Sequence, residues 1–214
     1  MTAPYYEHDG VQLFHGDCLD IPEWLDADVL VTDPPYGIAY TRPAIAAYNN
    51  PGHTGIVGDA TTEARDAVLD AWNGPAIVFG AFTHPPVNAK QVLVYVKPPD
   101  AGFMGSVGGY RRDCEGIYLL GNWGAGPGVR SSVIATGRAR VGGPSRGHPH
   151  SKPVDIMEQL IDVCLPGTIA DPFAGSGSTL VAARNLGRQA IGVEIEERYC
   201  EIIARRLDQA VLPL

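Results

Sequence analysis

The chain has 214 residues, of which 45% are hydrophobic and 19% are charged, and its formal net charge at pH 7 is −8. This size and apolar content suit a single α/β domain with one sizeable core over residues 1–214. No apolar run approaches the roughly 20 residues of a membrane span, and residues 1–5 lack a signal-peptide profile, so we expect a cytoplasmic protein with no membrane partner.

The cysteines are far apart in the sequence and form no Cys-x-x-Cys pair; they are Cys18, Cys114, Cys164 and Cys200. This spacing predicts neither a zinc site nor a disulfide framework. His148 and His150 are spaced like metal ligands, but no acid or cysteine stands near them. We therefore expect no metal.

Charge is distributed unevenly along the chain. Residues 101–153 contain seven Lys or Arg and two Asp or Glu, a net charge of +5, which leaves −13 for the remainder. One basic face on an acidic body favours a nucleic-acid partner. A solvated loop with scattered arginines is the alternative interpretation.

The first half of the chain alternates short apolar runs with polar, glycine-rich or proline-rich breaks. The runs predict strands over 11–14, 29–32, 76–79, 92–96 and 115–120, and helices over 21–25 and 61–72. Residues 37–58 have neither a helical nor an alternating period. A segment of that length inside a compact domain is usually functional or mobile, so we interpret it as a flap over a substrate.

The second half opens with residues 121–150, in which glycine, proline and arginine dominate and no core element is expected. Beyond Lys152-Pro153, apolar residues at helical spacing predict a helix from 154 to about 164. We then expect a strand over 168–170, a helix over 180–186, a strand over 190–193 and a helix over 197–209. Alternating strands and helices predict an α/β fold with a doubly wound, mostly parallel sheet.

Asp33-Pro34-Pro35-Tyr36 directly follows the predicted strand 29–32, and the carboxyl edge of such a sheet is where ligands bind. The Asp33 carboxylate and the Pro34 carbonyl are two acceptors suited to the two N–H bonds of an exocyclic amine on a flat heterocycle. They would stabilise the charge that develops when the nitrogen is methylated. Pro34 and Pro35 add no competing N–H donor, and Tyr36 can stack on an extruded base. An incidental proline-rich turn is the alternative.

A second motif runs from Asp171 through Gly175, Ser176, Gly177 and Thr179 into a predicted helix. The glycines let a ligand approach the backbone, and the helix start offers free N–H groups. Glu194 ends the next strand, where a carboxylate can accept both hydroxyls of a ribose. A dinucleotide fingerprint would have glycine at position 180, which is leucine, and the loop lacks the lysine of a P-loop. An acid that can pair with an ammonium group, Asp171, points to S-adenosylmethionine.

The two motifs in this order resemble the amino-methylating DNA methyltransferases of the permuted beta class, which act on adenine N6 or cytosine N4. Gly16-Asp17 and the segment from His148 to Pro153, which is similar to the His-Pro-x-x-Lys-Pro signature of that class, extend the resemblance over most of the chain. It implies a Rossmann-like methyltransferase fold with a seven-stranded sheet. It also implies that one strand near the end of the sheet, assigned to 115–120, is antiparallel.

The resemblance also implies roles for individual residues. Asp17 would contact the adenine of S-adenosylmethionine, Glu194 its ribose, and Ser151 and Lys152 would lie near its carboxylate. The methionine part would lie against a larger set, namely Asp171, Phe173, Gly175, Ser176, Gly177 and Thr179. An acid at position 33, where cytosine-N4 enzymes more often have serine, favours adenine N6 in double-stranded DNA, with the adenine flipped out of the helix. Cytosine N4, an RNA base and a non-catalytic DNA-binding role remain alternatives.

Two departures from the family pattern stand out. The stretch over 121–150, which we interpret as a DNA-recognition insert, is short and loop-like. A short target sequence, weak specificity or help from a second copy of the chain in a homodimer would each be compatible with it. Where the family often has Trp-x-Lys, the chain has Tyr95-Val96-Lys97.

Overall fold

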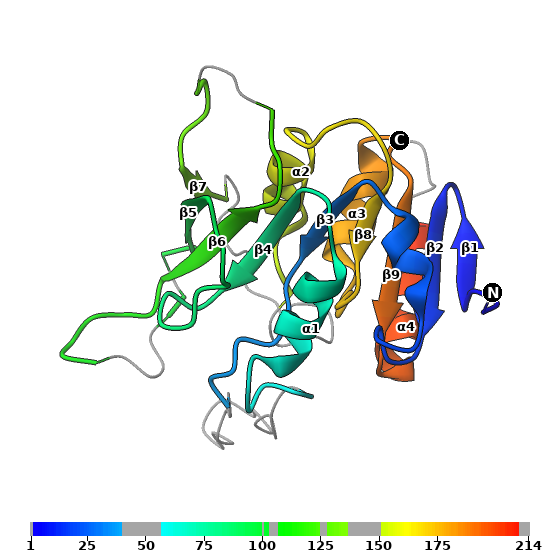
Figure 1. The fold of residues 1–214 in the computed structure, drawn as a ribbon, viewed down its shortest axis with the longest axis horizontal. Coiled ribbons are helices and arrows are strands. Elements are labelled where there is room, and N and C mark those ends of the chain that lie inside the picture. The colour runs from blue at the N-terminus through cyan, green and yellow to red at the C-terminus, as the bar shows by residue number, and fades with distance from the viewer. Residues whose placement is uncertain are drawn as a thin grey trace.

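The fold is built on one mixed sheet of nine strands in the order β1-β2-β9-β8-β3-β4-β6-β5-β7 (Figure 1). The computed structural model describes residues 2–39, 57–99, 101–102, 107–124, 128–136 and 151–209. The strands are β1 Tyr6–His8, β2 Val11–His15, β3 Val29–Thr32, β4 Ala76–Gly80, β5 Gln91–Val96, β6 Cys114–Leu120, β7 Val133–Ala135, β8 Ile169–Asp171 and β9 Ala190–Glu194.

The middle of the sheet, from β2 through β9, β8 and β3 to β4, is parallel throughout. β6 is antiparallel to both β4 and β5, which confirms the antiparallel strand expected over 115–120. The central strands are short apolar runs, and all four residues of β3 are buried. Such runs are typical of parallel strands that are covered on both faces.

Helices cover both faces of the sheet (Figure 1). On one face Val29 and Val31 of β3 pack in a cluster with residues of α2 Val154–Ile161, α3 Ser178–Asn185 and α4 Glu197–Gln209. On the other face Leu30 packs with residues of the 3-10 helix η1 Pro22–Asp26 and of α1 Glu63–Ala71. Successive residues of one strand thus serve opposite faces, as the pleat requires. The predicted doubly wound α/β architecture is confirmed.

Two short edge strands extend the seven that the resemblance implied. β1 pairs antiparallel with β2 across Asp9 and Gly10, which both have positive φ, as a tight hairpin turn requires. β7 pairs parallel with β5 and lies inside 121–150, where no core element was expected. Neither strand was predicted from the apolar pattern, because each has only three residues and is largely exposed. Within the described residues, no helix has the length and apolar character needed to cross a membrane.

Candidate functional site

Four acidic residues stand at or just beyond the carboxyl ends of four neighbouring parallel strands. Asp17 follows β2, Glu194 ends β9, Asp171 ends β8 and Asp33 follows β3. These strands are adjacent in the order β2-β9-β8-β3, so the acids form a row along one edge of the sheet. The carboxyl edge of an open parallel sheet is where α/β proteins bind ligands.

The tips of β3 and β8 are joined directly, although 139 positions separate the two residues that meet. The hydroxyl of Thr32 donates a hydrogen bond of 2.6 Å to Asp171 Oδ1, and both residues are buried. Asp33 is the next residue along the chain. The structure therefore brings the turn that begins at Asp33 beside the glycine-rich loop that follows Asp171.

The glycine-rich loop turns sharply into α3. Gly175 and Gly177 have φ of 53° and 77°, a region that side chains disfavour. A Cβ at position 177 would lie only 2.8 Å from Ile203 Cγ1, so α4 also packs too closely for a larger residue. Both glycines are therefore required by the backbone path.

Serine hydroxyls join this loop to the segment before α2. The hydroxyl of Ser176 donates to Ser151 Oγ at 2.8 Å, and that of Ser178 donates to the Lys152 carbonyl at 2.7 Å. Two predicted site residues from the family-like signature, Ser151 and Lys152, thus lie against the loop predicted to bind a ligand. Residues 148–150 of that signature, and residues 40–56 of the predicted flap, lie outside the described part of the chain.

Burial raises the pKa of the two acids at the centre of the row. The pKa of Asp171 rises to about 6, although hydrogen bonds from Thr179, Thr32 and the backbone N–H of Phe173 work against the rise. The pKa of Glu194 rises to about 7, against the hydrogen bonds that it accepts from the N–H groups of Glu196 and Gly175, at 2.8 and 2.7 Å. Buried carboxylates with this much desolvation favour positively charged or hydroxyl-bearing partners.

Asp17, at the outer end of the row, is more exposed and accepts the backbone N–H of Leu19 at 2.9 Å. The neighbouring Gly16 donates its N–H to the Glu194 carbonyl at 3.0 Å. Asp17 is therefore held beside the tip of β9 with its carboxylate open to solvent.

Asp33, at the other end of the row, belongs to a compact polar cluster. Its Oδ2 accepts Lys152 Nζ at 2.5 Å and its Oδ1 accepts the hydroxyl of Tyr36 at 2.7 Å. Lys152 Nζ is also 3.1 Å from the Tyr36 hydroxyl and 3.3 Å from Glu115 Oε2. The Lys152 side chain thus lies against the expected catalytic acid, while its backbone carbonyl contacts the glycine-rich loop.

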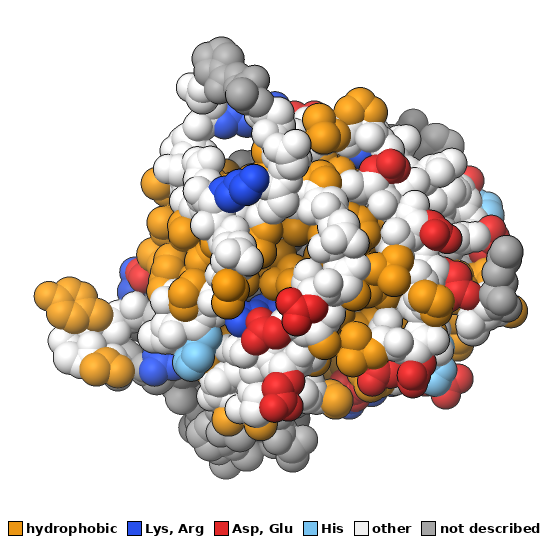
Figure 2. Space-filling view, viewed as in Figure 1, with side chains coloured by type: hydrophobic (Ala, Val, Ile, Leu, Met, Phe, Trp, Pro, Cys, Tyr) orange, Lys and Arg blue, Asp and Glu red, His pale blue; other side chains and the backbone are white. Residues whose placement is uncertain are grey.

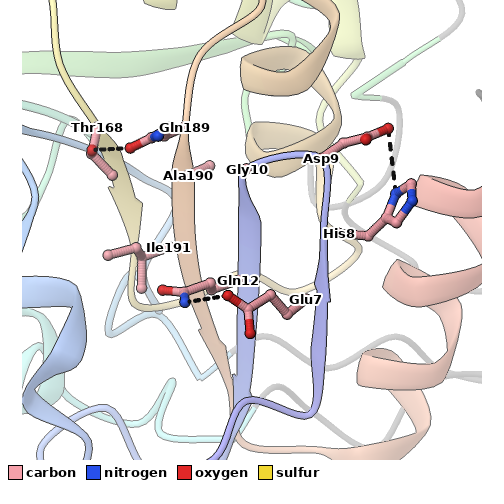
Figure 3. Close-up of a pocket in the computed structure, with 9 residues that line it drawn as sticks. All are labelled: Glu7, His8, Asp9, Gly10, Gln12, Thr168, Gln189, Ala190 and Ile191. Carbon is pink, nitrogen blue, oxygen red and sulfur yellow. Dashed lines mark hydrogen bonds and ion pairs between the residues drawn. The ribbon is translucent and has the colours of Figure 1, made fainter.

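A hollow of about 260 Å³ lies at the opposite edge of the sheet (Figure 3). It is lined by residues that precede or begin β2, β8 and β9, among them Gly10, Thr168 and Gln189. Because parallel strands start there, this hollow is separate from the row of acids. Among the described residues, no group of His, Cys, Asp and Glu is arranged to hold a metal ion.

Comparison with known proteins finds DNA methyltransferases similar to this chain. Residues 123–205 match the family model N6_N4_Mtase, described as DNA methylase. The Type II methyltransferase M.ScaI of Streptomyces caespitosus is 26% identical over 258 aligned positions, which cover 97% of this chain and 84% of M.ScaI. YubD of Escherichia coli (strain K12) is 29% identical, over 92% of this chain and 89% of its own length. Together these matches support an N6-adenine/N4-cytosine DNA methyltransferase.

Solved DNA methyltransferase structures share the fold of this chain. The M1.HpyAVI complex with S-adenosylmethionine superposes with a TM-score of 0.62 at 21% identity, covering 92% of this chain and 99% of M1.HpyAVI. The cytosine-N4-specific PvuII DNA methyltransferase gives a TM-score of 0.64 at 13% identity, covering 96% of this chain and 95% of the PvuII enzyme. At these identities the likeness concerns the fold.

Asp59 is a residue of the site that the sequence analysis missed. Its side chain is buried, and Oδ1 accepts the N–H groups of Tyr36 at 2.7 Å and of Gly37 at 3.0 Å. Its carbonyl accepts the N–H of Ala39 at 2.6 Å. Asp59 therefore fixes the backbone directly after Pro35. An isolated acid directly after the segment without periodicity, 37–58, gave no local signal of this contact.

Glu115 was also missed, because it was counted only as the first residue of a strand. It accepts Lys97 Nζ at 2.6 Å in addition to its contact with Lys152. Burial would raise the pKa of Glu115, but the two lysines outweigh that effect and lower it to about 2. Burial would likewise lower the pKa of Lys152, and Asp33 and Glu115 raise it instead. Glu115 and Lys152 are therefore both charged near neutral pH.

We predict that Asp59→Ala lowers the rate of methyl transfer to DNA by roughly 10²-fold, because a misplaced catalytic turn loses its geometry. Asp59→Asn keeps an acceptor oxygen for the Tyr36 N–H and should recover much of the rate. Steady-state assays with labelled cofactor would measure both variants, with Asp70→Ala on the exposed side of α1 as control. A wild-type rate for Asp59→Ala would contradict the positioning role.

Lys152→Met should lower the free energy of unfolding by about 3–5 kcal/mol, because it leaves two carboxylates without their shared buried cation. Lys97→Met should cost less, since Lys97 contacts only Glu115 of the pair and its side chain is 25% exposed. Urea denaturation of both variants measures the difference. If both variants lost the same free energy of unfolding, Lys152 would contribute no more to the stability of the cluster than Lys97 does.

Proposed function

We propose that this protein transfers a methyl group from S-adenosylmethionine to adenine N6 of a base flipped out of double-stranded DNA. The observation that carries the proposal is the order of the four acids along the sheet edge. Asp17, Glu194, Asp171 and Asp33 follow one another in the order in which an adenine, a ribose, a methionine ammonium group and a target amine would lie.

The residues present fit the cofactor. Each oxygen of Glu194 accepts one backbone N–H and retains a lone pair for a ribose hydroxyl. Asp171 is buried and would pair with the ammonium group, while Phe173, Ser151 and the loop residues Gly175, Ser176, Gly177 and Thr179 would surround the methionine part. The cofactor would supply an electrophilic methyl group on its sulfonium centre. The solved complex of M1.HpyAVI with S-adenosylmethionine supports this assignment.

Asp33 and Pro34 would hold the target amine. Among the described residues, no donor contacts the Pro34 carbonyl, whereas both Asp33 oxygens are occupied by Tyr36 and Lys152. An entering amine would therefore replace the Tyr36 hydroxyl on Asp33 Oδ1. That exchange frees the Tyr36 ring to stack on the base, and Lys152 continues to orient the carboxylate through Oδ2.

The choice of adenine rests on Asp33, since the resemblance associates an acid at this position with adenine N6. Methylation of cytosine N4 is the second candidate, because the fold is shared with the cytosine-N4-specific PvuII enzyme. Both reactions methylate an exocyclic amine that is held by two acceptors. The two candidates are therefore distinguished by identifying which nucleoside carries the new methyl group.

Asp33→Ala should reduce methyl transfer by at least about 10²-fold, since it removes an acceptor aimed at the developing charge. Cofactor affinity should stay within about twofold, because the other three acids of the row, and not Asp33, would bind the cofactor. Calorimetry would measure affinity, and mass spectrometry of digested DNA would identify the methylated nucleoside. Asp70→Ala serves as control. N4-methylcytosine in the product would overturn the adenine assignment, and full activity of Asp33→Ala would remove Asp33 from the mechanism.

The affinity for S-adenosylmethionine should increase as pH rises from 5 towards 7. The pKa of Glu194 is about 7 and that of Asp171 about 6, and hydroxyl or ammonium donors bind the ionised forms. Binding therefore releases protons, and affinity can tighten by up to about tenfold per pH unit for each group that is still protonated. Calorimetry at several pH values tests this, and Glu194→Gln should flatten the profile. An affinity independent of pH in the native protein would contradict the assignment of these acids.

A further inference from the structure

The connection between β5 and β6 starts and ends beside the expected catalytic acid. It consists of residues 97–113 and is called the arm below; the structure describes 97–99, 101–102 and 107–113 of it. β5 runs parallel to β3 by way of β4 and β6, so the arm leaves the sheet at the same edge as Asp33. Lys97 and Glu115 flank the arm, and Glu115 Oε2 lies 3.4 Å from the Tyr36 hydroxyl.

The two ends of the arm are held together by backbone contacts. Lys97 donates its N–H to the Asp113 carbonyl at 2.8 Å, and Arg112 donates to the Gly102 carbonyl at 2.9 Å. Gly102 has φ of 78°, and a Cβ there would lie 2.6 Å from the Arg112 carbonyl carbon. The two segments of the arm pass so close to each other here that position 102 requires glycine. The base of the arm is thus fixed relative to the sheet.

The tip of the arm is a tight turn formed by Val107, Gly108, Gly109 and Tyr110. Val107 and Tyr110 exchange backbone hydrogen bonds of 3.3 and 3.0 Å, and both glycines have positive φ. The Tyr110 side chain is 83% exposed and that of Val107 is 72% exposed. Figures 1 and 2 show the arm projecting from the body at the lower left, with hydrophobic side chains at its end.

The charges beside the tip favour a polyanionic partner. Arg111 and Arg112 follow Tyr110 directly and are both exposed. An aromatic side chain next to exposed arginines matches the two components of DNA, since bases stack on aromatic rings and phosphates attract arginine. A single exposed apolar residue would need no explanation, but here two largely exposed ones share one turn.

We propose that the Val107–Tyr110 turn inserts into the DNA helix beside the target base, with Tyr110 stacked on a base left without its partner and Arg112 on a phosphate. The inference rests on the proposed function and assigns the arm a DNA contact of its own. Tyr110 is five positions from Glu115 along the chain, so the tip can reach at most about 17 Å from the catalytic cluster. That span equals roughly five stacked base pairs, so the tip can contact the duplex that holds the target.

The test compares binding to two fluorescently labelled duplexes of the same arbitrary sequence, one intact and one with a central abasic site that leaves the opposite base unpaired. Native protein should prefer the abasic duplex. Tyr110→Ala should weaken that binding by roughly 5- to 100-fold, the effect typical of a lost base stack. Tyr110→Trp should retain the preference, and Tyr5→Ala, at the other end of the sheet, should not alter it. Arg112→Ala should make the DNA affinity less dependent on salt concentration, by the amount expected for the loss of about one phosphate contact.

Equal affinity of Tyr110→Ala and native protein for the abasic duplex would overturn the proposal. Tyr110→Leu separates stacking from general apolar contact, and full binding by this variant would also count against stacking. The same preparations are assayed for methyl transfer to amplified, unmethylated DNA. Native protein that methylates this DNA while Tyr110→Ala binds normally would refute only the role of the turn. Native protein that neither binds nor methylates DNA would refute both this inference and the proposed function.

Discussion

The hydrogen bond from Thr32 to Asp171 is the contact on which the organisation of the site depends. It joins the tips of β3 and β8, and the paired strands bring Val29 opposite Ile169 and Leu30 opposite Ala170. Because the register is fixed by this pairing and side chains alternate between faces, a shift of one residue would turn Thr32 away from Asp171 and redirect Asp33. The chemistry of two distant motifs is therefore set by the pairing of two short buried strands.

The edge of the sheet contains two electrostatic environments. At β8 and β9, burial dominates and raises the pKa of Asp171 and Glu194. At β3 and β6, two lysines dominate and lower the pKa of Glu115 despite its burial. The first environment favours a ligand that brings its own positive charge and donors, whereas in the second the two lysines already hold the Glu115 carboxylate ionised. Carboxylates that each stand near the end of a strand thus differ in pKa because of the groups around them, and they suit different partners for that reason.

Much of this arrangement could be predicted from the sequence, because its signals are local. The bounds of β3 and α4 were predicted correctly from an apolar run and a helical period. Asp59 and Glu115 could not be found in this way. Asp59 acts on a backbone 23 positions away, and the role of Glu115 arises only when β6 is placed beside Lys152. The lysine itself was expected near the cofactor carboxylate, a role that stays a prediction.

The position of Glu115 also connects the arm to the acceptor site. It is the second residue of β6, two positions from the last backbone contact at the base of the arm, and it shares Lys152 with Asp33. A force on the arm that shifted β6 along its strand direction would change the distance from Glu115 to Lys152. The Lys152 ammonium group would then interact more strongly with one of the two carboxylates, Glu115 or Asp33, than with the other. Because Lys152 compensates both charges, loss of one contact strengthens its hold on the other. The cluster therefore provides a direct physical link between the arm and the acid proposed to hold the target amine.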